Sequence, residues 1–308
     1  MHKVFFFAIT LLLMVSDFVF RPAVSTRERV AILCHPANMP DDMKAFASDP
    51  AFQALHLSPL TIHYQVQGEM VKYPVAAGPE ATAYLVKAKK KSNKWLFVYQ
   101  EWWGLNEHIK KQADQFYNDL GGDVNVLALD MYDGKVTTDP KEAGQIMQGM
   151  QEARLQGIVE GGVKYAGSKA KIASVGWCFG GGWSLKSAII GGKQNVGCVM
   201  YYGMPVRDVE KLKTLNSDVL GLFATEQYIS KEIIEDFAAK MKEAGKQLEY
   251  KIFTGVHGFA NPSNPKYDQA LAAELEAGQR HVDRRVGPAG QIERDGRKLD
   301  VTPPWPRR

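Results

Sequence analysis

Gly-Trp-Cys-Phe-Gly at residues 176–180 is the stretch that decides the fold. The apolar run before it, residues 171–175, is typical of a buried strand, and residues 181–190 are typical of a helix. Cys178 therefore falls at a strand-to-helix turn, where flanking glycines allow a strained backbone that exposes the side chain at the edge of the sheet. The N-terminus of the following helix favours a thiolate at this position. A glycine-rich turn around a structural cysteine is the alternative, whereas a phosphate loop is disfavoured because no Gly-Lys-Ser/Thr follows.

The rest of the pattern predicts a three-layer α/β sandwich whose sheet is mostly parallel, with helices on both faces. Near-alternating apolar positions predict three antiparallel entry strands at 61–66, 71–76 and 81–86. Continuous apolar runs predict strands buried on both faces at 95–99, 124–129, 172–176, 196–202, 219–223 and 248–253. Amphipathic stretches predict crossover helices at 106–120, 140–166, 181–190, 231–244 and 267–279.

The N-terminal residues predict export. A basic start at Lys3 and an uncharged apolar run over 4–16 indicate a signal peptide, which we place at residues 1–25. We expect a periplasmic or secreted protein with no stable membrane span after signal cleavage; an uncleaved signal is the alternative and would anchor it to the membrane.

Composition predicts two further segments, one before and one after the main domain. Residues 26–60 are weakly patterned and are predicted to be an N-terminal arm on a domain of residues 61–280. Residues 281–308 have few apolar positions, clustered charge and three prolines close together, Pro303, Pro304 and Pro306, which predicts a disordered tail.

Net charge and cysteine content bear on which classes of function are expected. The 308 residues carry a net charge of +4, and the tail alone holds seven Lys/Arg against four Asp/Glu, so the body is near neutral and nucleic acid is not an expected partner. The three cysteines, Cys34, Cys178 and Cys198, leave at least one thiol free, and catalysis would explain a free thiol in an oxidising compartment. A monomer is the favoured state, although the sequence does not fix it.

A thiol nucleophile needs a base, and His257 is the predicted one. It follows the strand at 248–253 in a short loop, at the carboxyl edge of the sheet where the histidine of such sites comes last in the chain. His108 is the rival, but it falls at the start of a helix.

The expected carboxylate is Glu226, which follows the strand at 219–223 and would orient the imidazole of His257. Asp218 precedes that strand and Glu232 lies in the next helix, so both are less suitable. An ordinary surface role for Glu226 stays open.

Residues 100–106, Gln-Glu-Trp-Trp-Gly-Leu-Asn, lie at the carboxyl end of another strand. This loop and the elbow nominate the backbone N–H groups of Trp102 and Phe179 as an oxyanion hole. Glu101 would lie beside Cys178, where a buried carboxylate can hold the sulfur protonated until substrate displaces it. The adjacent side chains of Trp102 and Trp103 are expected to line the pocket.

Three regions together resemble the dienelactone hydrolase family of α/β-hydrolases. They are Gly-Trp-Cys-Phe-Gly-Gly at 176–181, the loop at 100–106 and His-Gly-Phe-Ala at 257–260, within a likeness that spans roughly residues 65–280. The resemblance implies an α/β-hydrolase sandwich that cleaves a small cyclic enol-lactone through a thioester, as a carboxymethylenebutenolidase does, with no metal and no organic cofactor. It also implies Cys178 as nucleophile, His257 as base and Glu101 as the resting partner of the thiol.

Two departures affect the substrate. The family's acid is usually aspartate, whereas this loop has Glu226 followed by Gln227, and an arginine that binds the substrate carboxylate in the best-studied members is Asn261 here. We expect Trp103, Phe259 and Asn261 to contact a small ester or lactone other than dienelactone itself. The alternatives are a hydrolase of another ester class, or a non-catalytic ligand-binding or thiol-redox protein that kept the fold.

Overall fold

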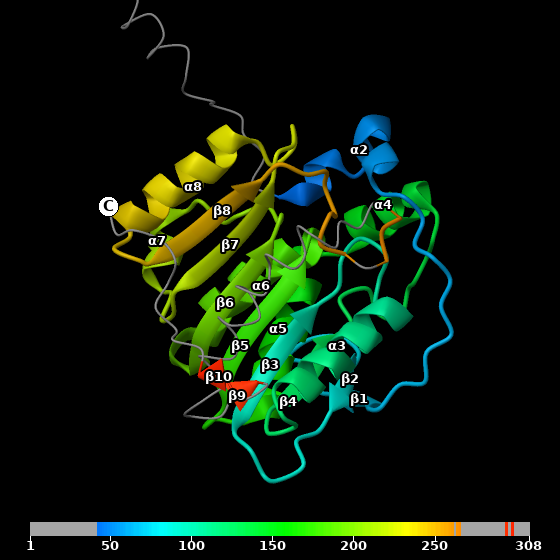
Figure 1. The fold of residues 1–308 in the computed structure, drawn as a ribbon, viewed down its shortest axis with the longest axis vertical. Coiled ribbons are helices and arrows are strands. Elements are labelled where there is room, and N and C mark those ends of the chain that lie inside the picture. Colours follow the sequence, from blue (N-terminus) through cyan, green and yellow to red (C-terminus); the bar gives the residue numbers. More distant parts are fainter. Residues whose placement is uncertain (1–41, 262, 266–292, 295–296, 299–308) are drawn as a thin grey trace, which may run out of the picture. The chain divides into compact units, whose positions relative to one another are not determined.

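The computed structural model describes residues 42–261, 263–265, 293–294 and 297–298, and the described residues belong to a compact unit that begins at Pro40. An eight-stranded sheet forms its centre, in the order β1-β2-β4-β3-β5-β6-β7-β8 (Figure 1). The strands are β1 (Glu69–Tyr73), β2 (Ala81–Val86), β3 (Lys94–Tyr99), β4 (Asn125–Leu129), β5 (Lys171–Trp177), β6 (Asn195–Tyr201), β7 (Val219–Ala224) and β8 (Leu248–Phe253).

The six strands β4, β3, β5, β6, β7 and β8 pair with one another in parallel, and β1 and β2 join this sheet through antiparallel pairs. β1 pairs with β2 and β2 with β4 in antiparallel register, and every later pair, from β4·β3 to β7·β8, is parallel. The central strands are buried along almost their whole length because helices cover both faces of the sheet. The predicted α/β sandwich is confirmed, and all parallel strands end at one edge of the sheet.

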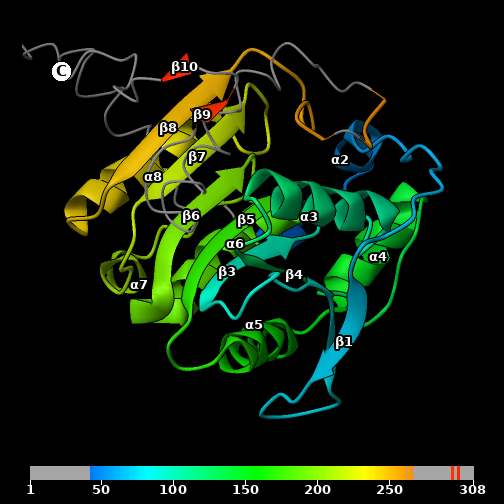
Figure 2. The same ribbon diagram turned by 60° about the horizontal axis from the view of Figure 1, so that its bottom comes forward.

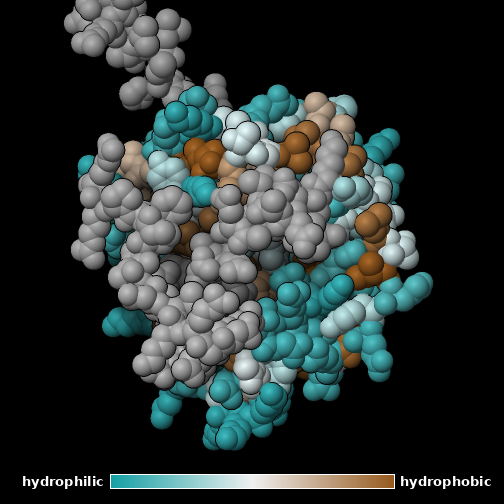
Figure 3. Space-filling model, in the orientation of Figure 1, coloured by the Kyte–Doolittle hydropathy of each residue, from teal (hydrophilic) through white to brown (hydrophobic). Residues whose placement is uncertain are grey.

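Helices α3 and α5 lie on opposite faces of the sheet (Figure 2). The sheet's helices are α3 (Glu107–Asp119), α4 (Pro140–Gly149), α5 (Glu152–Ala166), α6 (Phe179–Gly191), α7 (Val209–Lys213) and α8 (Lys231–Glu243). α3 is amphipathic: Ile109, Ala113 and Phe116 are buried against the sheet, while its outer side is mainly hydrophilic (Figure 3). α6 is buried almost all round, which suits a helix at the centre of the molecule.

Two predicted elements differ in the structure. Residues 61–66 form no strand, because their alternating side chains lie beside α3, where the carbonyl of Leu60 contacts the ring of His108 and Gln67 N–H donates to Asp114. The predicted helix at 140–166 is two helices, since Met150 and Gln151 have extended backbone and a new helix begins after Gln151. The predicted helix at 267–279 lies outside the described residues.

The segment before the sheet has its own short helices, the 3₁₀ turn η1 (Met43–Phe46) and α2 (Pro50–Leu55). Asp42 and Asp49 cap them by accepting backbone N–H bonds. Both pack on α4, and Gly144 is needed there because a Cβ would lie 2.3 Å from the carbonyl oxygen of Ala47. We call residues 42–57 the arm.

The two ends of the chain are described only in part. The predicted signal peptide lies outside the described residues, and in the part that the structure describes no helix combines the length and apolar character needed to cross a membrane. Within residues 281–308 the described residues form two short antiparallel strands, β9 (Glu293–Arg294) and β10 (Arg297–Lys298).

Candidate active site

Cys178 lies between β5 and α6 with a strained backbone. Its φ of 56° and ψ of −119° are in a region that side-chain-bearing residues rarely adopt. Glycine is needed on both sides: a Cβ on Gly176 would lie 2.2 Å from the carbonyl oxygen of Gly180, and one on Gly180 would lie 2.3 Å from that of Gln100. The turn therefore has the geometry expected of a nucleophile elbow.

The Cys178 sulfur is buried, with 1% of the residue exposed. Burial raises the pKa of the thiol, while His257 and a hydrogen bond from the Phe179 backbone lower it and the Glu101 carboxylate raises it. The backbone of Phe179 therefore faces the sulfur, next to which an oxyanion would form.

His257 and Glu226 form a buried pair at the ends of two neighbouring strands. His257 follows β8 and Glu226 follows β7, and Nδ1 of the imidazole lies 2.9 Å from both carboxylate oxygens. The two side chains are 2% and 5% exposed. Burial opposes charge on the ring, but Glu226 and Cys178 outweigh it and raise the pKa of His257 well above its usual value. The structure thus brings the predicted base and acid into contact.

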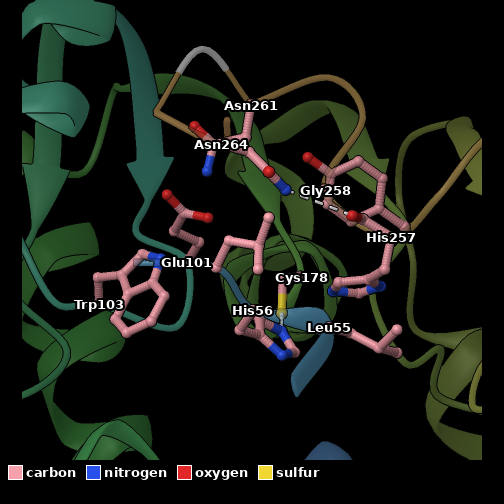
Figure 4. Close-up of a pocket in the computed structure, with 11 residues that line it drawn as sticks. Leu55, His56, Glu101, Trp103, Cys178, His257, Gly258, Asn261 and Asn264 are labelled. Atoms are coloured by element: carbon pink, nitrogen blue, oxygen red, sulfur yellow. Dashed lines mark hydrogen bonds between the residues drawn. The ribbon is translucent and has the colours of Figure 1, made fainter. Parts of the chain in front are cut away.

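A second imidazole, His56, approaches the sulfur from the arm (Figure 4). Its Nε2 lies 3.4 Å from Sγ of Cys178, and its ring stacks on Trp102 with centroids 4.4 Å apart. Nδ1 donates to the carbonyl oxygen of Phe52 at 2.9 Å, so the neutral ring has its lone pair on Nε2. Burial, followed by repulsion from His257, lowers the pKa of His56 to about 3, which keeps the ring neutral.

The sequence analysis did not select His56. It sits one residue past a six-residue helix in a stretch without strand pattern, and its position depends on side-chain packing between the arm and α4. No local motif marks it. His108, the rival considered for the base, lies in the first turn of α3 and contacts Leu60.

Glu101 lines the same pocket from the end of β3 and is 4% exposed. Ser263 Oγ donates to its carboxylate at 3.0 Å. Burial raises the pKa of Glu101 to about 7, although hydrogen bonds with Asn261 and Ser263 and the attraction of His257 lower it. Two groups from the arm, His56 and the Met43 sulfur, lie 3.4 Å from Cys178 Sγ, whereas Glu101, expected beside the thiol, acts on it only through its charge.

The pocket above Cys178 is small, and its roughly 270 Å³ of empty space includes open solvent. Trp103 and Asn261 line it, as expected (Figure 4). Trp102 is fully buried behind His56. Phe259 differs from expectation: its ring packs on Tyr202 and Phe253 in the core and does not line the pocket.

A mostly parallel sheet, a cysteine at a strained strand-to-helix turn and an imidazole–carboxylate pair on the next strand ends define an α/β-hydrolase. Residues 81–283 match the dienelactone hydrolase family, and the chain belongs to that family. It is accordingly a hydrolase that acts on a small molecule.

Individual proteins are similar to this chain in sequence or in fold. Protein usf of Aquifex pyrophilus is 28% identical over 227 residues, which cover 67% of this chain and 94% of the relative. Two solved structures share the fold: a dienelactone hydrolase-like promiscuous phosphotriesterase from metagenomic libraries (TM-score 0.62, 20% identity, 73% of this chain and 100% of that one) and a dienelactone hydrolase from Anabaena variabilis (TM-score 0.54, 16% identity, 72% and 100%).

Proposed function

We propose that the protein hydrolyses a small ester or lactone through a thioester formed on Cys178, with His257 as base and Glu226 as its orienting acid. The observation that carries the proposal is the contact of His257 Nδ1 with both Glu226 oxygens at 2.9 Å, because it leaves Nε2 free to serve the sulfur. Nε2 and Sγ lie within 4.8 Å of each other.

The reaction follows from these positions. Nε2 of His257 takes the thiol proton as Sγ attacks the carbonyl carbon, and the imidazolium is stabilised by Glu226. The oxyanion is stabilised by the N–H groups of Phe179 and Trp102 at the start of α6 and the end of β3. The imidazolium then protonates the leaving alkoxide, and water activated by the same nitrogen cleaves the thioester.

Glu101 has a secondary part in this scheme. With a pKa raised to about 7, its carboxyl group holds a proton over part of the physiological range and limits the negative charge beside the sulfur. Ionisation of Glu101 would disfavour the thiolate.

The pocket favours an uncharged substrate. Within the described part of the chain its lining includes no lysine or arginine, and Asn261 stands where the family's best-studied members have arginine. An anionic substrate would lose its hydration without gaining a cationic partner. We therefore place neutral short-chain esters and small lactones ahead of dienelactone and other carboxylates.

Paired substrates test the proposal. A neutral ester and its analogue with a carboxylate on the acyl chain would be compared with wild type, with and without prior alkylation of the thiol. We expect turnover of the neutral ester, weaker turnover of the anionic one, loss after alkylation and a mass increase on Cys178 when the reaction is quenched early. Absence of hydrolysis across esters and lactones, with the thiol intact, would favour a ligand-binding or thiol-redox protein.

We also propose that the chain is exported, on the basis of the basic start and apolar run in residues 1–16. Fusion of residues 1–40 to a reporter that is active only outside the cytoplasm tests this. N-terminal sequencing of the exported fusion separates a cleaved signal from an uncleaved membrane anchor.

A further inference from the structure

Three buried side chains that can bind a metal ion, His56, Cys178 and His257, converge at the elbow. Nδ1 of His56 donates to the Phe52 carbonyl and Nδ1 of His257 donates to Glu226, so Nε2 is the nitrogen that each ring can offer to a ligand, in His257 once the second ring proton is lost. The thiol has one proton to donate, and it faces Nε2 of His56 and the Met43 sulfur, both at 3.4 Å. Nε2 of His257 is fully buried, and the Cys178 thiol is the group that interacts with it.

Nε2 of His56, Nε2 of His257 and Sγ of Cys178 all lie within 4.8 Å of one another, and all three residues are buried. Figure 4 shows that both imidazoles point toward the sulfur, His56 from the arm and His257 from the loop after β8. Two imidazole nitrogens and a thiol that converge in this way form a donor set that a soft cation can bind.

The surroundings of the two rings also match those of metal ligands. A histidine that binds a metal usually donates its other ring N–H to a carboxylate or a backbone carbonyl, and His257 and His56 do so to Glu226 and Phe52 respectively. The 3.4 Å between Nε2 of His56 and Sγ is close to the roughly 3.5 Å that bonds of about 2.05 Å to nitrogen and 2.3 Å to sulfur give in a tetrahedron.

We propose that His56, Cys178 and His257 bind a thiophilic cation, Zn²⁺ or Cu⁺, that holds the nucleophile in an inactive form. The cation replaces the thiol proton and the Nε2 proton of His257, which leave to solvent, and the thiolate and the buried Glu226 and Glu101 carboxylates offset its charge. Hydrolysis itself needs no such ion, so the site is regulatory.

Met43 distinguishes the two ions. A thioether is a ligand for Cu⁺ but is not among the usual ligands of Zn²⁺, and the Met43 sulfur lies 3.4 Å from Sγ. Met43→Leu keeps the apolar volume, so it should weaken Cu⁺ binding and leave Zn²⁺ binding almost unchanged.

The test is direct metal binding by the full chain, without substrate. Metal-free protein is titrated with Zn²⁺ against a chromogenic zinc chelator and with Cu⁺ against a copper(I) chelator, and Co²⁺ serves as the optical probe for a metal–thiolate bond. We expect one equivalent of Zn²⁺ or Cu⁺ to bind, and a near-ultraviolet charge-transfer band with Co²⁺ that disappears in Cys178→Ser.

His56 supplies the decisive variants. His56→Phe keeps a ring on Trp102, and His56→Gln provides a second variant if the first folds poorly; each should weaken binding by at least about 100-fold, since even loss of an outer-shell partner costs 10–100-fold. His108→Phe, which removes a histidine outside the cluster, should not. Equal affinity in wild type and the His56 variants, or no thiolate band, overturns the proposal. Because no substrate is used, this result is independent of whether the proposed hydrolysis is found.

Discussion

Two parts of the chain meet at Cys178, the carboxyl ends of the sheet strands and the arm. Glu101, Cys178, Glu226 and His257 each follow a parallel strand, so the register of the sheet sets their positions. His56 is instead placed by packing: Phe52 is fully buried and its ring contacts those of His56 and Trp102. Burial of one such ring stabilises the arm by about 1.5–3 kcal/mol.

The difference suggests a division of roles. Groups fixed by the backbone of the sheet suit bond-making steps, which depend on position to within a fraction of an ångström. Groups fixed by a few side-chain contacts suit shielding and control, because local opening of such a segment costs less than unfolding the sheet. Removing sheet-borne groups should therefore abolish chemistry, while removing arm-borne groups should modulate it.

The largest effect is expected from Cys178→Ala. Loss of the nucleophile should lower kcat for any ester or lactone substrate by at least about 10³-fold. Cys198→Ala is the control, because Cys198 is also a free, buried cysteine but lies in the middle of β6 and should leave turnover within a few-fold. Near-normal turnover by Cys178→Ala would end the assignment of the nucleophile.

Glu226→Gln should have the next largest effect. The amide supplies no charge to the imidazolium and favours the wrong tautomer of His257, so kcat should fall by about 100-fold or more. The melting temperature, measured in parallel, separates this loss from unfolding. Gln227→Ala is the matched control, because its neutral amide cannot stabilise an imidazolium. A nearly silent Glu226→Gln would indicate a Cys178–His257 dyad, or Glu101 as the acid.

These two predictions concern residues that the sequence could identify, and the reason is the parallel sheet. Strands such as β5, β7 and β8 are recognisable as continuous apolar runs, and parallel strands end at the same edge, so residues just after them must lie near one another. That geometry led to Glu226 and His257 without any knowledge of side-chain contacts.

The rest of the site depended on packing that local patterns do not encode. His56 and Met43 reach the sulfur only because the arm packs on α4, more than 80 residues away in sequence. The same limit applies to residues 61–66. Their apolar and polar side chains alternate as in a strand, but the sheet begins with β1, which pairs with β2 alone. Phe259 was predicted as a substrate contact from its neighbours in sequence, whereas its ring belongs to the core.

His56→Phe should have a smaller effect than either sheet-borne variant. His56 lines the pocket with Leu55 and Leu57, so its loss should raise KM, while kcat falls by less than about tenfold, equivalent to roughly 1.4 kcal/mol. Measuring kcat and KM separately, in metal-free buffer, tests this. A fall in kcat as deep as that of Glu226→Gln would make His56 the base and would reverse the roles assigned to arm and sheet.

Among these variants Glu101→Gln should have the smallest effect on turnover, and its effect should appear in stability. The folded-state pKa of about 7 lies above the ordinary value of 4.5, so the folded protein binds this proton more tightly than the unfolded chain does. Wild type therefore loses stability as pH rises from about 4.5 to about 7, by on the order of 3 kcal/mol, because a charge must then be buried. The amide carries no such charge, so the melting temperature of Glu101→Gln should rise relative to wild type by several degrees between about pH 5 and about pH 8. Any constant offset from altered hydrogen bonds to Ser263 does not affect this pH-dependent difference. Glu249→Gln, at an exposed position on β8, should show no such trend. A difference between Glu101→Gln and wild type that is the same at all pH values would mean that Glu101 is ionised as readily in the folded protein as in the unfolded chain.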